Sequence, residues 1–443
     1  MEGDRIVWML HWNDIPSQYR ALRRRFPTFR QYVDVIVDLR VTSLKDGRTR
    51  SIGYTLMKGV PGGMNVSLRD WLEAVPFAFR MRLDEEMLET AALLGLAELM
   101  LSGCTTAADF HNLYYPGIAF DSTAVIFRAA ERLGLRLVLC RGAGTRMRRS
   151  AQAASLTMPP ETYASVLADI ERITARWHDP SPAAMRRVVV APSSFTLSLE
   201  PAELQDLAAL ARRLGLRLHS HLAESPDDVT YCREMHGLRP LEYAARHGWT
   251  GEDVWFAHLV HVDAEDIRIL AASRTGIAHC PGSNARIGMG IAPVLEMRDA
   301  GVRIGLGQDG GAANDPGDMI AEAHIAWYLH RAKGGYEALS IEETIHWGTR
   351  GGAEILGLDS VGALIPGLAA DLAIYELDDL RFAAFHDVAI APVATGIRPH
   401  LKCLMVGGRI VVEDDRVLGI DAGELRQRTR AAVRRLKNGG SPN

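Results

Sequence analysis

The sequence is poor in cysteine, and its five cysteines are dispersed. They are odd in number and form no Cys-x-x-Cys pair: Cys104, Cys140, Cys232, Cys280 and Cys403. This pattern argues against a disulfide scaffold and predicts reduced thiols in a cytoplasmic protein.

Long apolar runs and a strong net charge are also missing. No run is long enough to span a bilayer, and the apolar residues 6–10 are too few for a signal-peptide core. A net charge of -4 over 443 residues gives no field that would attract nucleic acid or an anionic membrane. The 47% apolar and 23% charged content is that of a soluble globular protein, and the length predicts one large domain with a smaller one.

The first 48 residues differ from the rest of the chain. Residues 20–30 are basic without a clear apolar period, and we interpret the three arginines at 23–25 as solvated surface rather than a nucleic-acid contact. Residues 33–41 alternate enough apolar side chains to predict a strand. We therefore treat residues 1–48 as an atypical N-terminal segment.

Alternating helices and strands dominate residues 49–360. Helices are predicted at 85–101, 122–133, 161–177 and 204–214, and seven strands at 104–110, 136–140, 187–192, 217–222, 254–258, 276–279 and 302–307. This order predicts an α/β fold with a parallel sheet. A doubly wound sheet is the alternative, but no Gly-x-Gly-x-x-Gly follows an early strand.

Polar residues gather where these strands end, which favours a (β/α)8 TIM-like barrel with its site at one rim. The residues concerned are Asp109, His221, His258, His279 and Asp309. Residues 361–443 change in pattern, with short strands near 372–375 and 401–412 and a helix at 424–436. They predict a small β-sandwich domain, complete or incomplete, with a terminal helix.

The segment from His219 to Glu224 (His-Ser-His-Leu-Ala-Glu) is the centre of the predicted site. Because side chains alternate along a strand, His219 and His221 share one face. A His with a Glu three residues on can combine a metal ligand with a proton carrier, although an isolated pair is as easily a hydrogen-bonded strand end. His219 lies one layer deeper, and we expect it to be packed and hydrogen-bonded.

Three later motifs complete a pattern that resembles the amidohydrolase superfamily, in its branch of aromatic-ring deaminases and related chlorohydrolases. After the His-x-His-Leu-Ala-Glu segment come Ala-His-Leu-Val-His at 257–261, Ala-His-Cys-Pro-x-Ser-Asn at 278–284 and Gly-x-Asp-Gly at 307–310. The match runs from about Gly53 to the C-terminus. Further segments are similar to deaminases of pterin or oxidised purine rings, such as isoxanthopterin and 8-oxoguanine.

The resemblance implies a metal-dependent deaminase that releases ammonia from an amino-substituted aromatic heterocycle. His221 and Asp309 would hold one Zn or Fe ion, and Asp309 would accept a proton from the attacking water. Glu224 would deliver a proton to the ring nitrogen, while His258 would orient the water or polarise the target. Family members also suggest a homo-oligomer acting on a small-molecule substrate.

The roles of several other residues stay open between chemistry and structure. His261 and His279 would contact substrate or brace a loop, and Ser283 and Asn284 are expected to hold a turn. Asp109 and His111 also lie at the rim. The remaining histidines considered are expected at the surface: His178, His236, His247, His330 and His400.

The sequence departs from the family at the first barrel strand, where a His-x-His normally supplies two further ligands. Those positions hold Thr49 and Ser51, and Tyr54 stands where a substrate-binding Gln is common. His258 could serve as a third ligand. The alternatives are an encoded N-terminus altered by a shifted frame or start, an inactive homologue that binds without turnover, and a chlorohydrolase or amide hydrolase.

Overall fold

The computed structural model describes residues 45–49, 52–146 and 158–439. Most of the atypical segment predicted for residues 1–48, including the strand expected at 33–41, lies outside these ranges. Residues 45–48 of this segment, together with Thr49, form β1 (Lys45–Thr49), which belongs to the main sheet.

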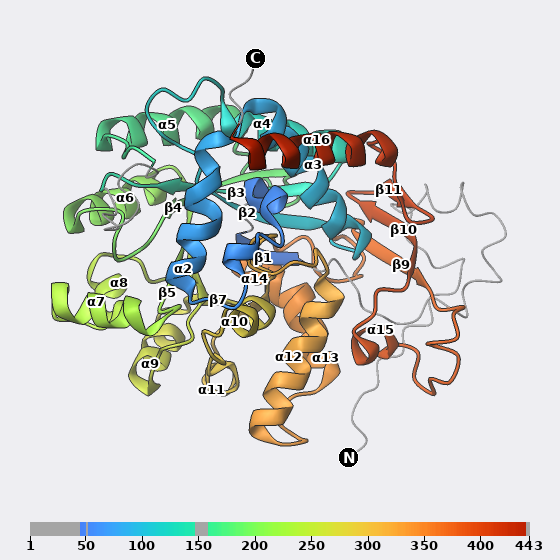
Figure 1. Ribbon diagram of the computed structural model, residues 1–443. Helices are drawn as coiled ribbons and strands as arrows, with labels where there is room; N and C mark the ends of the chain where they lie inside the picture. The colour runs from blue at the N-terminus through green and yellow to red at the C-terminus, as the bar shows by residue number, and fades with distance from the viewer. Residues whose placement is uncertain (1–44, 50–51, 147–157, 440–443) are drawn as a thin grey trace.

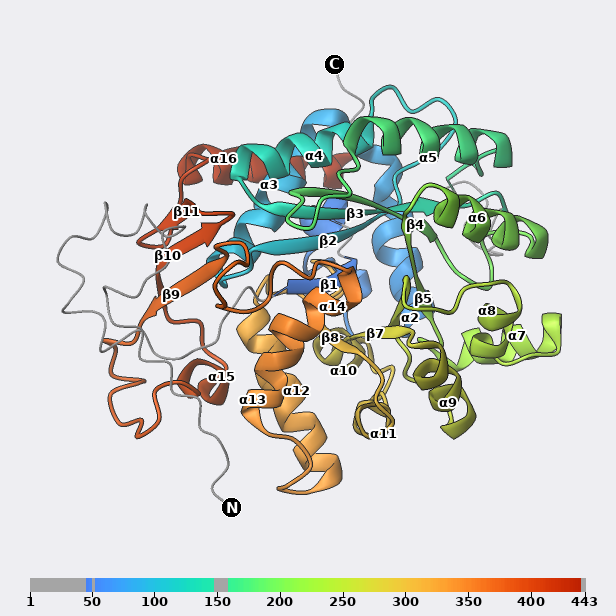
Figure 2. The ribbon, with the colours of Figure 1, turned by 180° about the vertical axis from the view of Figure 1, so that it is seen from behind.

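The main sheet has eight strands in the order β1 to β8, and every neighbouring pair is parallel. β1 also lies beside β8, with Cα atoms within 8 Å, so the first and last strands of the sheet meet. The segments that follow these two strands are also in contact, because Trp71 Nε1 on α2 (Leu68–Leu72) donates a hydrogen bond to Ala312 O in the loop after β8 (3.2 Å). Figures 1 and 2 show the sheet curled within a ring of helices, which confirms the TIM-like barrel. The other strands are β2 (Thr106–His111), β3 (Arg136–Ala143), β4 (Arg186–Pro192), β5 (Arg217–Leu222), β6 (Val254–His258), β7 (Gly276–His279) and β8 (Ile304–Leu306).

The helices that cover the barrel follow the predicted pattern, and two predicted ranges, 85–101 and 122–133, coincide with α3 and α4. Asp121 caps the start of α4, and Gly134 (φ 72°) ends it in the left-handed region that favours glycine. The covering helices are α2 (Leu68–Leu72), α3 (Glu85–Leu101), α4 (Ser122–Leu133), α5 (Tyr163–Trp177), α6 (Pro201–Arg213), α7 (Pro226–His236), α8 (Pro240–Arg246), α9 (Ala264–Ser273), α10 (Pro281–Ile287), α11 (Val294–Asp299), α12 (Met319–Gly334), α13 (Ile341–His346) and α14 (Gly352–Leu356).

The barrel interior is narrow and is closed at its amino-terminal end by α14. Ile355 of α14 packs in the same buried cluster as the interior residues Ala108 and Ala278. A Cβ at Gly276 of β7 would lie only 2.7 Å from the Ile355 side chain, and one at Gly305 of β8 only 2.5 Å from it. The absence of a side chain at these two glycines therefore lets β7 and β8 pack closely against α14. The carboxyl ends of the strands are therefore the end at which a site can open.

The C-terminal part adds a four-stranded antiparallel sheet in the order β12-β11-β10-β9, which confirms the predicted small β domain. Its strands are β9 (Leu372–Glu376), β10 (His400–Val406), β11 (Arg409–Glu413) and β12 (Arg416–Val417), and α16 (Ala422–Asn438) follows. α16 returns to the barrel, where Arg428 pairs with Glu89 of α3 at 2.6 Å. The buried pair of Arg136 and Asp371 joins β3 to the segment before β9.

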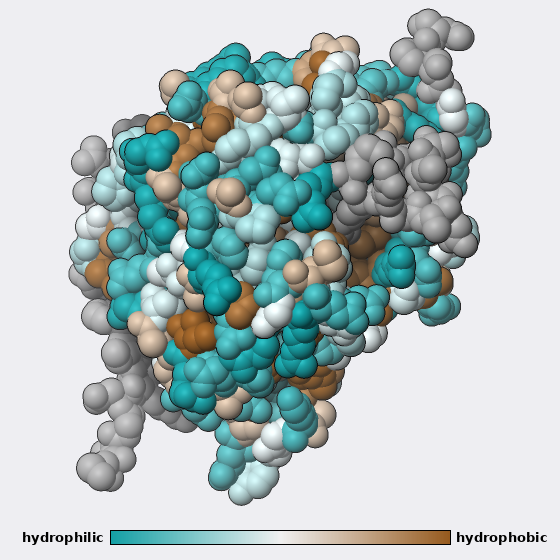
Figure 3. Space-filling view, turned by 90° about the vertical axis from the view of Figure 1, so that its left-hand side faces the viewer, coloured by the Kyte–Doolittle hydropathy of each residue, from teal (hydrophilic) through white to brown (hydrophobic). Residues whose placement is uncertain are grey.

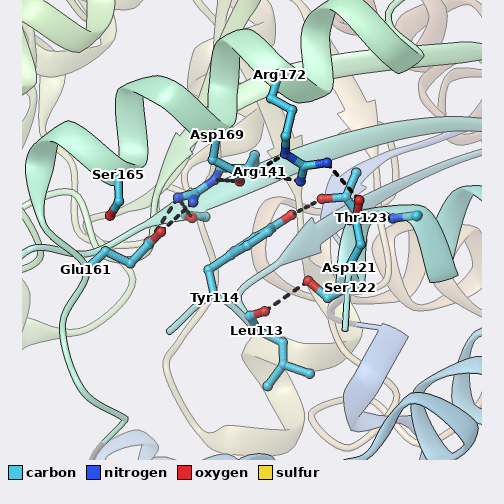
Figure 4. A network of polar contacts seen from close by, with 12 residues as sticks. Leu113, Tyr114, Asp121, Ser122, Thr123, Arg141, Glu161, Ser165, Asp169 and Arg172 are labelled. Carbon is cyan, nitrogen blue, oxygen red and sulfur yellow. Dashed lines mark hydrogen bonds and ion pairs between the residues drawn. The ribbon is translucent and has the colours of Figure 1, made fainter. Parts of the chain in front are cut away.

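Arg141, near the end of β3, fixes the loops around it (Figure 4). Its guanidinium lies 4.1 Å from the Tyr114 ring centroid and bonds Glu161 Oε2 (2.9 Å) and Asp169 Oδ2 (3.0 Å). The neighbouring His111 is buried, and burial lowers its pKa to about 3, so its ring is neutral. This network holds the loop after β2 and the start of α5.

The face that carries α6, α7 and α8 is mostly hydrophilic, with separate hydrophobic patches (Figure 3). Within the described ranges, no helix is both long and apolar enough to cross a membrane.

Candidate metal centre

Three side chains that could bind metal converge where β5, β6 and β8 end. One ligand atom from each of His221, His258 and Asp309 lies within 4.8 Å of the others. The two imidazole rings are stacked, with centroids 5.2 Å apart and an interplanar angle of 29°. Two imidazole nitrogens and a carboxylate oxygen form a donor set that suits Zn²⁺ or Fe²⁺.

The backbone at this rim adopts a conformation that non-glycine residues rarely take. φ is 71° at His258, 70° at Asp309 and 49° at Ala223. Trp255 packs in the barrel interior, so strand alternation alone would turn His258 outward, towards the helices. The left-handed turn at the strand end instead brings its ring over the mouth of the barrel. Such strain is found most often at functional sites.

A hydrogen bond fixes which nitrogen of His258 can bind metal. Nδ1 lies 2.9 Å from Asn284 Oδ1, and an amide oxygen can only accept, so Nδ1 donates. In the neutral imidazole this leaves the lone pair on Nε2, which lies 3.4 Å from Glu224 Oε1. The Glu224 carboxyl group therefore lies beside the His258 nitrogen that would bind a metal.

Asp309 is held equally firmly. Its Oδ2 accepts a hydrogen bond from Ser283 Oγ (2.5 Å), and its Oδ1 accepts one from Gly310 N (2.7 Å). Both Ser283 and Asn284 are buried on α10. The sequence predicted only that they hold a turn; the structure shows that they also orient two members of the cluster. The sequence signal was their position directly after the strand that ends at His279.

His219 is packed and hydrogen-bonded, as expected. Its Nδ1 donates to Trp255 O (3.0 Å), and its ring stacks on the Trp255 indole with centroids 4.7 Å apart. It lies below His221, with ring centroids 6.0 Å apart.

His279 faces the helices rather than the barrel interior. Its Nε2 lies within hydrogen-bond distance (2.9 Å) of His330 Nε2 on α12, while Ala278 points inwards. This geometry favours the bracing alternative over substrate contact. The prediction that His330 and His247 lie at the surface was wrong: His330 on α12 is buried beside His279, and His247 at the end of α8 is buried beside Tyr243.

The other two predicted substrate residues, His261 and Tyr54, are not members of the three-residue cluster. His261 is half-buried after β6, where its backbone N–H donates to Ala223 O (3.0 Å). Tyr54 lies half-buried in a short 3₁₀ helix (Ile52–Met57), and Asp109 Oδ1 accepts from Ile52 N (2.8 Å) at its start. The side chain of Thr49 and the whole of Ser51 lie outside the described part of the chain.

Comparison with known proteins places this geometry in context. The Amidohydrolase family model matches residues 52–411. An isoxanthopterin deaminase from an unknown prokaryotic organism is 48% identical over 397 residues, covering 86% of this chain and 82% of the relative. An 8-oxoguanine deaminase from Pseudomonas aeruginosa is 40% identical over 386 residues, covering 86% and 84%.

Solved structures agree with this assignment. An amidohydrolase from an environmental sample of the Sargasso Sea matches with a TM-score of 0.78 and 44% identity, covering 90% of this chain and 85% of the other. An atrazine chlorohydrolase variant from Arthrobacter aurescens TC1, in complex with zinc and atraton, has a TM-score of 0.82 and 29% identity, covering 88% and 87%. The sequence, the barrel and the cluster at its rim lead to one conclusion: this chain belongs to the amidohydrolase family.

Proposed function

We propose that this protein is a metal-dependent hydrolytic deaminase of an amino-substituted aromatic heterocycle, a pterin or an oxidised purine. The observation that carries the proposal is the convergence of His221, His258 and Asp309, with Glu224 Oε1 3.4 Å from His258 Nε2. The similarity to deaminases of isoxanthopterin and 8-oxoguanine supports this substrate class.

The residues present fit one divalent metal, zinc or iron. His221, His258 and Asp309 would supply three protein ligands, which is the usual number at a catalytic zinc that keeps one open position. When bound, the metal would lower the pKa of a coordinated water. His258 would thus take the place of a ligand that other family members draw from the first barrel strand.

The side chains around this position can move the protons that deamination requires. Ser283 holds the Asp309 carboxylate in orientation. Asp309 would accept a proton from the attacking water. Glu224, which is 18% exposed, would carry a proton to the ring nitrogen beside the attacked carbon. The water oxygen forms a bond to the C–NH2 carbon, the C–N bond breaks, and the nitrogen leaves as ammonia.

The test is ammonia release from isoxanthopterin and 8-oxoguanine by protein supplied with zinc or iron. We expect metal-dependent turnover of at least one ring, and loss of turnover in Glu224→Gln. Tight ring binding without ammonia and without metal dependence would instead identify an inactive homologue. Chloride release from chlorinated triazines, with no ammonia from any ring, would identify a chlorohydrolase.

Two further expectations rest on the family resemblance and on the dispersed cysteines, respectively. We propose a homo-oligomer, which the mass measured by light scattering would test, and a cytoplasmic location, which cell fractionation would test.

A further inference from the structure

Three consecutive residues at the start of α10 each contact a different part of the site. Gly282 N donates to Glu322 Oε2 (3.1 Å), Ser283 Oγ donates to Asp309 Oδ2 (2.5 Å), and Asn284 Oδ1 accepts from His258 Nδ1 (2.9 Å). The position of this short helix therefore sets the orientation of two metal-binding candidates at once.

Glu322 joins α10 to the loop that carries Asp309. It lies on α12, and its side chain is fully buried. Its Oε1 accepts a hydrogen bond from Asn314 Nδ2, and Asn314 Nδ2 also donates to Gln308 O (2.9 Å). Gln308 directly precedes Asp309, so one carboxylate bonds both the loop after β7 and the loop after β8.

The fit around this carboxylate is close. A Cβ at Gly282 would lie 2.4 Å from Glu322 Oε1 and 2.6 Å from Asn314 Nδ2, so there is no room for a side chain there. The carboxylate therefore rests directly against the backbone of α10. Each of its two oxygens accepts a hydrogen bond from a different loop, which suits a group that must hold two loops in register.

We propose that Glu322 is a positioning residue that sets the separation of His258 and Asp309, and through it the affinity of the metal site. The inference rests on the proposed metal-dependent function. It goes beyond that function by assigning a role to a side chain on α12 that is linked to the cluster through Gly282 and Asn314.

Glu322→Gln is the informative variant because it keeps the side-chain volume while it removes the carboxylate charge and replaces one acceptor oxygen by an NH2 donor. A glutamine amide offers one oxygen to two facing donors, Gly282 N–H and Asn314 Nδ2, and its own NH2 group opposes one of them. Metal-free protein would be titrated with Co²⁺ and followed by its visible absorption. Because loss of a supporting contact at a metal site typically weakens binding about 10–100-fold, we expect a change of that size and altered band intensities.

Asp318→Ala is the matched control. Asp318 is a carboxylate that caps the same helix, accepting from Ile320 N (2.9 Å) and Ala321 N (3.3 Å). Its loss should lower the melting temperature and leave the Co²⁺ dissociation constant unchanged. Gly282→Ala is a second test, needed if Glu322→Gln does not fold, because it displaces the carboxylate without changing charge. It should weaken Co²⁺ binding in the same direction.

The outcomes separate this inference from the proposed function. Normal Co²⁺ binding by the wild type and by the Glu322 and Gly282 variants, with only a lower melting temperature in the variants, would mean that Glu322 is merely structural and would overturn the inference. Absence of Co²⁺ binding by the wild type would overturn the metal site itself, and with it both proposals.

Discussion

Replacing Asn284 by alanine should weaken the metal site by an amount that the structure allows us to estimate. Asn284 Oδ1 is the acceptor for Nδ1–H of His258, whose side chain is fully buried. Leaving a buried donor unsatisfied costs about 1–3 kcal/mol. Since about 1.4 kcal/mol corresponds to a factor of ten, metal affinity should fall between about 5-fold and 150-fold, a span that includes the roughly 10–100-fold typical of supporting residues at metal sites.

The assay is a Co²⁺ titration in competition with a chelator, with melting temperature measured on the same samples. Asn284→Asp is the control, because its carboxylate still accepts from Nδ1–H and should retain tight binding. A dissociation constant for Asn284→Ala within about threefold of wild type would refute the reasoning, since it would show that His258 needs no fixed tautomer. Equal losses in both variants would show that the contact acts through packing alone.

Three other changes test separate parts of the account. Glu224→Gln should lower deamination by roughly 10²–10⁴-fold with one metal still bound per chain, which ammonia release and metal analysis would check together. Burial lowers the pKa of His330 from 6.5 to about 4, so the unfolded chain binds the extra proton and stability should fall as the pH drops from about 6.5 towards 4. His330→Leu should flatten that slope by up to about 1.4 kcal/mol per pH unit, as measured by urea unfolding at several pH values. Asp371→Ala leaves the buried Arg136 without its partner and should cost about 3–5 kcal/mol of unfolding free energy, whereas Asp379→Ala, at an exposed pair, should not move the unfolding midpoint.

Much of the site's chemistry could be predicted because it is local in sequence. Alternation along β5 placed His221 above His219, and the motifs at three strand ends identified His258, Asp309 and Glu224 as a group. The apolar periods predicted the bounds of α3 and α4. In contrast, β1 was missed because its five residues, Lys-Asp-Gly-Arg-Thr, carry no apolar alternation. Pairing with β2 and packing beside β8 make it a strand.

What the sequence determined by itself was the barrel and the residue types at its rim, because these depend on periodicity and spacing along the chain, and the family, which the resemblance of its motifs indicated. Only the tertiary structure decided which of those side chains meet. Asn284 and His258 are 26 residues apart in the sequence, and Glu322 and Gly282 are 40 residues apart. Both pairs come into contact because the fold brings the segments after neighbouring strands together. His330 is buried because α12 brings it against His279 at the end of β7. Contacts of this kind depend on the direction in which each loop leaves the sheet, and that direction is set by barrel closure and by the left-handed turns at the strand ends.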